Sequence, residues 1–98
     1  MIDELEMAMQ EESFALVDNY EKPSIVLFGK RIAGSHTKNG EIIEDIQYYV
    51  GQTWKDEDSF SMHHINSYDR LKLWLNQCTT GGYAYYLNLY KSRLNDNE

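Results

Sequence analysis

The chain has 98 residues, of which 42% are hydrophobic and 13% aromatic, with one cysteine and a formal net charge of −7. This length is typical of one domain that buries its own core, and a single cysteine excludes an internal disulfide. The acidic start lacks the basic and apolar regions of a secretory signal. No segment approaches the ~20 apolar residues of a transmembrane helix, so we expect a soluble cytoplasmic protein that does not bind membranes.

The charges are segregated along the chain. Residues 1–21 hold seven carboxylates and no Lys or Arg, and residues 22–40 hold four Lys or Arg and no carboxylate. Residues 41–58 then hold six carboxylates and one Lys. Blocks of this kind can create surfaces of one sign that steer a partner. The alternative is an acidic surface that serves only solubility.

Residues 2–20 are predicted to form an N-terminal helix, because their apolar residues recur near the 3.6-residue period of one helix face. Pro23 limits that helix, since the residue before a proline disfavours the helical conformation. The sequence SFALV (13–17) leaves a short strand open as an alternative.

Two strands are predicted next, over residues 24–34 and 41–52. The first is continuously apolar, as in a strand buried on both faces, and the second alternates. Asn39-Gly40 between them is a strong turn signal, because both residues tolerate a positive φ. We therefore expect an antiparallel hairpin.

A third strand is predicted over residues 60–65, followed by a helix over about 67–78. Asn66-Ser67 can cap the start of the helix, and the glycines of TTGG (79–82) suit its end. Residues 83–90 fit either a strand or a helix. Their aromatic content after Gly-Gly favours a strand, and residues 92–98 are expected to fray.

The predicted fold class is α+β: an antiparallel three- to four-stranded meander with one helix, at about 67–78, packed on it and an N-terminal helix. The whole chain, residues 1–98, is expected to be a single small acidic domain.

The sequence has few candidate residues for catalysis or metal binding. His63 and His64 are adjacent, so on a strand they point to opposite faces and cannot chelate one ion together. Further ligands would have to come from His36 or the acidic residues 56–58, without the spacing of a closed zinc site. Cys78 lies near a helix C-terminus, where the dipole disfavours a reactive thiolate. We expect no enzyme activity, metal or cofactor.

Binding is the better-supported role. A basic patch of four cations on a −7 chain is a poor footprint for direct nucleic-acid binding. Helical carboxylates four residues apart rise about 6 Å, which is comparable with phosphate spacing, so a basic protein would be attracted to them. Tyrosine is enriched at interfaces, and the chain has eight. The predicted contact residues are Glu4, Glu11, Glu12, Glu44, Asp45, Asp56, Glu57, Asp58 and the exposed tyrosines Tyr49, Tyr86 and Tyr90, unless a homodimer or a helix covers the tyrosine face.

In size, acidity and lack of a catalytic constellation, the chain is similar to small phage-encoded inhibitors, including anti-restriction and anti-CRISPR proteins that imitate DNA. This likeness is one of composition and transfers no residue. The leading hypothesis is a non-enzymatic inhibitor that occludes the basic site of a nucleic-acid-handling protein. One alternative is an immunity protein, antitoxin or transcription regulator that acts by protein–protein binding. Another is a small metal-dependent enzyme that uses His63 or His64.

Overall fold

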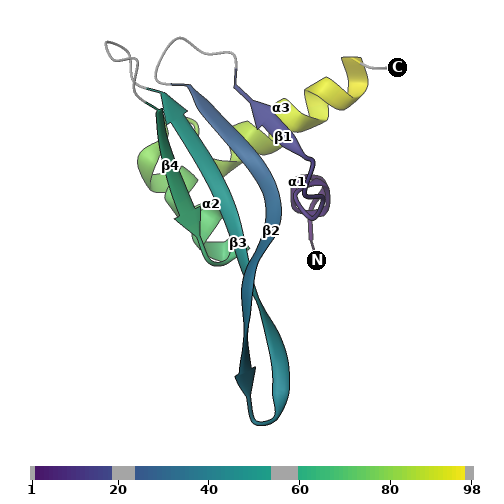
Figure 1. Ribbon diagram of the computed structural model, residues 1–98. Helices are drawn as coiled ribbons and strands as arrows, with labels where there is room; N and C mark the ends of the chain where they lie inside the picture. Colours follow the sequence, from purple (N-terminus) through teal and green to yellow (C-terminus); the bar gives the residue numbers. More distant parts are fainter. Residues whose placement is uncertain (1, 19–23, 54–59, 97–98) are drawn as a thin grey trace.

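The computed structural model describes residues 2–18, 24–53 and 60–96 (Figure 1). The elements are, in chain order, α1 (Glu4–Ala8), β1 (Ala15–Val17), β2 (Ile25–Lys38), β3 (Glu41–Thr53), β4 (Phe60–Ile65), α2 (Tyr68–Cys78) and α3 (Gly82–Asp96). The four strands form one antiparallel sheet in the order β1-β2-β3-β4. The α+β class and the antiparallel meander predicted from the sequence are confirmed.

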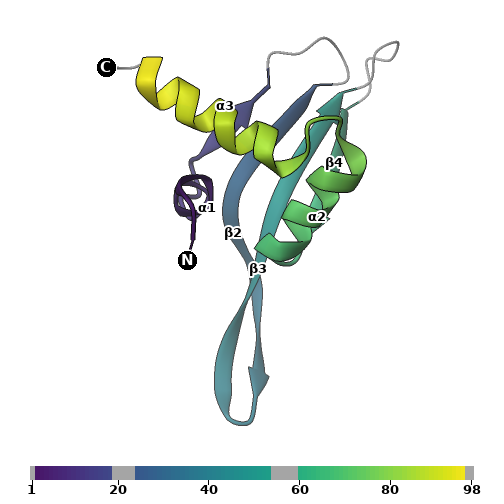
Figure 2. The same ribbon diagram turned by 180° about the vertical axis from the view of Figure 1, so that it is seen from behind.

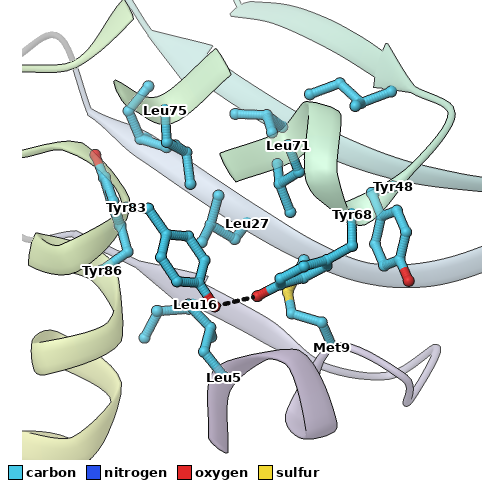
Figure 3. Close-up of a cluster of buried hydrophobic side chains, with 13 residues drawn as sticks. Leu5, Met9, Leu16, Leu27, Tyr48, Tyr68, Leu71, Leu75, Tyr83 and Tyr86 are labelled. Carbon is cyan, nitrogen blue, oxygen red and sulfur yellow. Dashed lines mark hydrogen bonds between the residues drawn. The ribbon is translucent and has the colours of Figure 1, made fainter. Parts of the chain in front are cut away.

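The helices cover one face of this sheet. Figure 2 shows α2 and α3 in front of the strands, whereas Figure 1 shows the opposite face without a covering element. Side chains alternate between the two faces of a strand, and the core consists of the residues that face the helices. Its largest fully buried members are Leu5, Met9, Leu27, Leu71, Leu75 and Val50 (Figure 3).

The hairpin of β2 and β3 closes at the predicted turn. Asn39 has a φ of 52° and Gly40 a φ of 80°, the left-handed values that a two-residue hairpin turn requires. Lys38 pairs with Glu41 across this turn. The predicted hairpin is therefore confirmed, with both strands longer than expected.

The predicted N-cap and limits of α2 are also confirmed, whereas the predicted glycine end is wrong, because the C-cap is Thr79 in an extended conformation. The Ser67 hydroxyl accepts a hydrogen bond from the Arg70 amide at 3.2 Å, which satisfies one of the donors left free at a helix start. The apolar positions Tyr68, Leu71 and Leu75 are buried against the sheet.

The preference for a strand over residues 83–90 was wrong, because this segment belongs to α3. The helix start is fixed by two side chains: Asn76 Oδ1 accepts from the Tyr83 amide at 2.9 Å and Thr79 Oγ1 from the Gly82 amide at 3.1 Å. Tyr83 and Tyr86, three residues apart, then share the buried helix face. The helix continues to Asp96, so the expected fraying over residues 92–96 was also wrong.

The prediction of a long N-terminal helix was wrong as well. α1 ends at Ala8, and residues 15–17 form β1, which agrees with the alternative prediction of a strand in SFALV. The reason lies in β2, where a bulge turns two amides outward. The Lys30 amide donates to the Met9 carbonyl at 2.6 Å and the Gly29 amide to the Phe14 carbonyl at 2.9 Å. These long-range bonds hold residues 9–14 in a turn rather than a helix.

Candidate functional site

The most prominent surface feature is the hairpin arm, which we define as residues 31–46. The arm extends beyond the helices that cover the sheet (Figures 1 and 2), and every residue in it is exposed. It carries four isoleucines, with exposed fractions of 61% for Ile32, 77% for Ile42, 39% for Ile43 and 37% for Ile46. A hairpin has no core of its own to bury such side chains, so the arm presents them to solvent.

Three of these isoleucines share one face of the arm. Ile42 and Ile46 alternate with Glu44 along β3, and Ile32 pairs directly with Ile46. Residues at alternate positions lie on one face, so this isoleucine face continues the side of the sheet that the helices cover in the body. The helices end before they reach it. The result is an apolar ridge with Glu44 between its members.

The charge blocks of the sequence meet on the arm. Its β2 strand carries Arg31, His36 and Lys38, and its β3 strand carries Glu41, Glu44 and Asp45. The pairing sets Lys38 opposite Glu41, and His36 Nδ1 lies 2.8 Å from Asp45 Oδ1. Of the predicted contact residues, Asp45 therefore lies beside His36, whereas Glu44 pairs with Ser35 and lies between the isoleucines of the ridge.

A second group of predicted carboxylates lies near the base of the arm. Glu4 is in α1, and Glu11 and Glu12 are in the turn that follows it; all three are exposed. The Glu11 carbonyl lies directly against Gly29 of β2: a Cβ at Gly29 would sit 1.8 Å from that oxygen. Residues 2–17 contain no Lys or Arg, so this segment is an anionic edge beside the arm. Asp56, Glu57 and Asp58 lie outside the described residues.

The three predicted tyrosine contacts differ in their placement. Tyr49 is half-buried on the uncovered face of the sheet, in edge contact with His64 at 4.8 Å between ring centroids. Tyr90 is half-buried and packs edge-on against Phe14. Tyr86 was wrongly expected at the surface. Because α3 is a helix, Tyr86 turns inward, is 3% exposed, and donates to the buried carboxylate of Asp18 at 2.8 Å.

The uncovered side of the sheet is itself a distinctive surface, which we call the open face. Phe60 lies across Gly51, where an added Cβ would meet the Phe60 ring at 2.5 Å and the Phe28 ring at 3.3 Å. Phe60, Met62 and Val17 are 52%, 41% and 40% exposed. By register, the open face in the four-stranded body consists of Ala15, Val17, Val26, Phe28, Tyr49, Gly51, Thr53, Phe60, Met62 and His64, none of which is Asp or Glu.

The two adjacent histidines lie on opposite faces of β4. His63 is half-buried beneath α2, with Nε2 at 3.3 Å from Gln52 Oε1 and its ring 4.9 Å from that of Trp74. His64 lies on the open face and is exposed. Across residues 2–18, 24–53 and 60–96, no three His, Cys, Asp or Glu side chains are grouped to hold a metal ion. Cys78, the last residue of α2, is exposed.

A partly buried hydrogen-bonded network at the junction of the three helices was not foreseen from the sequence. The Tyr83 hydroxyl donates to the Asp3 carboxylate at 2.7 and 2.8 Å to its two oxygens, so the Tyr68 hydroxyl, 2.8 Å away, donates to Tyr83 (Figure 3). Asp3 also caps α1 by accepting from the Glu6 amide. Lys72 Nζ lies 5.6 and 5.1 Å from the two ring centroids.

The surroundings of Asp3, Tyr68 and Tyr83 shift the pKa values of all three groups. Burial, together with the neighbouring hydroxyl and Asp3, raises the pKa of Tyr68. Burial and the hydrogen bond to Asp3 raise the pKa of Tyr83 against the opposing effect of the Tyr68 hydroxyl. Burial alone would raise the pKa of Asp3, but hydrogen bonds from Glu6 and Tyr83 and the charge of Lys72 together lower it. The hydrogen bonds among Tyr68, Tyr83 and Asp3 thus join a carboxylate to two neutral phenols and connect α1 to α2 and α3.

No protein-family model matches this chain, and neither a curated protein nor a solved structure matches it. Within the described part of the chain, no helix combines the length and apolar character needed to cross a membrane.

Proposed function

We propose that this protein is a non-enzymatic binding protein that engages a protein partner through its hairpin arm. The observation that carries the proposal is the exposure of every residue over 31–46, including four isoleucines, in a segment that extends past the folded body. The exposed area of these side chains contributes no burial to the fold. Full burial of an exposed isoleucine contributes about 1.5–3 kcal/mol, and Ile32 and Ile42, at 61% and 77% exposed, have the most left to bury.

The charge of the molecule supports a partner with a basic surface. The net charge is −7, and the anionic edge with Glu4, Glu11 and Glu12 lies at the base of the arm. A partner that received the arm in a groove would meet this edge at the rim, where opposite charges speed association. We propose that the partner is a nucleic-acid-handling protein in the cytoplasm whose basic site is occluded. The compositional likeness to phage-encoded inhibitors, including DNA mimics and anti-CRISPR proteins, supports this proposal.

One specific observation favours a second candidate. The arm carries charges of both signs, with Lys38 opposite Glu41 and the His36 ring 2.8 Å from Asp45. An apolar contact of this kind, with little net charge, suits an immunity protein, antitoxin or transcription regulator that recognises a neutral groove.

The test begins with capture of partners from the native host on the intact protein and identification by mass spectrometry. The affinity of the captured partner is then measured for the arm variant I32T/I42T and for the control L73T/L94T, which removes two exposed leucines from α2 and α3. We expect the arm variant to bind at least about 10-fold more weakly, because two apolar anchors are lost, and the control to bind as the wild type does. Equal affinities for all three proteins would contradict the proposal.

Salt separates the two candidates. If the partner is basic, the association rate should fall as salt rises and in the variant E11K/E12K, since screening acts on exposed charges. An association rate that is independent of both would support the neutral-groove candidate and exclude occlusion of a basic site.

A further inference from the structure

We infer that the open face is the interface of a homodimer, in which the uncovered sheets of two copies pack against each other. An antiparallel sheet with one face in water alternates apolar and polar side chains. In the body of this sheet the second face is also apolar: Val17, Val26 and Phe28 are followed by Phe60 and Met62. Such a composition is expected of a strand that is covered on both sides.

The packing on this face resembles half of an interface. Phe60 and Phe28 converge over Gly51, and Tyr49 contacts His64 edge-on. The aromatic rings of three neighbouring strands, β2, β3 and β4, therefore meet on this face. Two such surfaces can stack about 10 Å apart with their side chains interleaved, as in a β-sandwich. The same patch then serves both copies, as a two-fold dimer requires.

Charge identifies the second copy as the occupant. Two chains of −7 repel each other as a whole, but the open face has no carboxylate in the four-stranded body. Two copies that meet through these body residues place no carboxylate of one directly against a carboxylate of the other. A basic partner gains nothing from this face, because it is attracted to the anionic edge instead.

The size of the face is sufficient for a dimer of modest affinity. Strands about 4.8 Å apart with a rise of about 3.3 Å per residue give the ten residues of the open face a footprint of about 300 Å². Accessible surface exceeds the footprint because side chains stand out from the sheet. A specific interface needs about 1,000 Å² in total, or about half of that from each copy.

The test is sedimentation equilibrium of the intact protein from about 1 to about 100 µM, the range that suits a small interface. We expect a reversible dimer that tightens with added salt, since salt screens the repulsion between the two acidic copies. M62E should weaken the dimer at least 10-fold by placing two carboxylates in an apolar contact. The matched control L73E adds the same charge to α2, at a residue that is 54% exposed against 41% for Met62, and should dimerise as the wild type does.

V17K, at the β1 end of the same face, provides a second variant whose folding is independent of any effect at Met62; circular dichroism checks both. A wild-type protein that stays monomeric throughout would overturn the inference, as would equal weakening by M62E and L73E. Persistence of the dimer in M62E and V17K with loss in I32T/I42T would assign the contact to the arm and also overturn it. None of these outcomes depends on the heterologous partner of the proposed function.

Discussion

At the scale of single residues, the chain Tyr68–Tyr83–Asp3 links the three helices through two hydroxyls and one carboxylate. The sequence shows three scattered polar residues, separated by up to 80 positions. Tyr83 became a central member only because residues 82–96 are helical. Aromatic enrichment favoured a strand there, but the side-chain caps from Asn76 and Thr79, which bond amides seven and three residues further on, favoured the helix.

Replacement of Tyr83 by Phe should destabilise the fold more than replacement of Tyr68. Y83F removes both hydrogen bonds of the chain and leaves the buried Tyr68 hydroxyl without its acceptor, at a cost of about 1–3 kcal/mol. Y68F removes one bond and leaves the Tyr83–Asp3 bond intact, at a cost of about 1 kcal/mol. Urea unfolding of the three proteins measures the difference. A larger effect of Y68F would show that Tyr68, not Tyr83, holds the junction.

At the scale of elements, the base of the hairpin arm depends on a glycine at one position of β2. Gly29 meets the Glu11 carbonyl, 18 residues earlier in the chain, so closely that a Cβ would lie 1.8 Å from the oxygen. The sequence predicts the hairpin from its alternation and the Asn39-Gly40 turn, because both signals are local. It does not reveal the bulge at Gly29, since the contact that requires it comes from a different element.

G29A should therefore destabilise the protein by about 1–3 kcal/mol, the usual cost of forcing extra volume into a packed site. G34A is the control within the same strand. A Cβ at Gly34 meets only Asp45 Oδ2, at 3.9 Å, so this change should be neutral or stabilise by about 0.4–1 kcal/mol through the unfolded state. Thermal unfolding of both variants checks the prediction. Similar melting temperatures for G29A and the wild type would mean that residues 9–14 can move away without loss.

At the scale of the whole molecule, the burial of the two tyrosines has a consequence for stability in alkali. Tyrosine in the unfolded chain ionises near pH 10, whereas the pKa of Tyr68 and Tyr83 is raised in the folded protein. Above about pH 10 the folded state binds more protons than the unfolded state, so the free energy of unfolding falls as pH rises. The contribution of these tyrosines is complete below that pH.

Urea unfolding at pH 8, 9 and 10.5 should show this fall in the wild type and a shallower fall in Y68F/Y83F. The acid side has the opposite sign: the pKa of Asp3 is lowered, so its contribution is present above about pH 4 and is lost as pH falls through its folded-state value. Identical slopes in alkali for the wild type and Y68F/Y83F would contradict the assignment.

The sequence also predicts the fold class better than it predicts which residues form the candidate binding surface. Alternation, caps and turns gave the meander and α2, because each is set by neighbouring residues. The contact residues depend on which elements meet. Tyr86 turned inward with α3, and Asp45 lies beside His36 on the arm. Of the expected carboxylate array, the described residues place Glu4, Glu11 and Glu12 together on the anionic edge.

The separation of the arm from the core has an evolutionary consequence. Residues 31–46 contribute little to the interior, so substitutions there cost the fold almost nothing provided that the turn and the strand pairing remain. Under the proposed function, recognition can drift, or be re-engineered by grafting another hairpin between Lys30 and Gln47, while the helices and the body of the sheet stay constant. A lineage under pressure from a changing target could therefore exchange its specificity without rebuilding its scaffold.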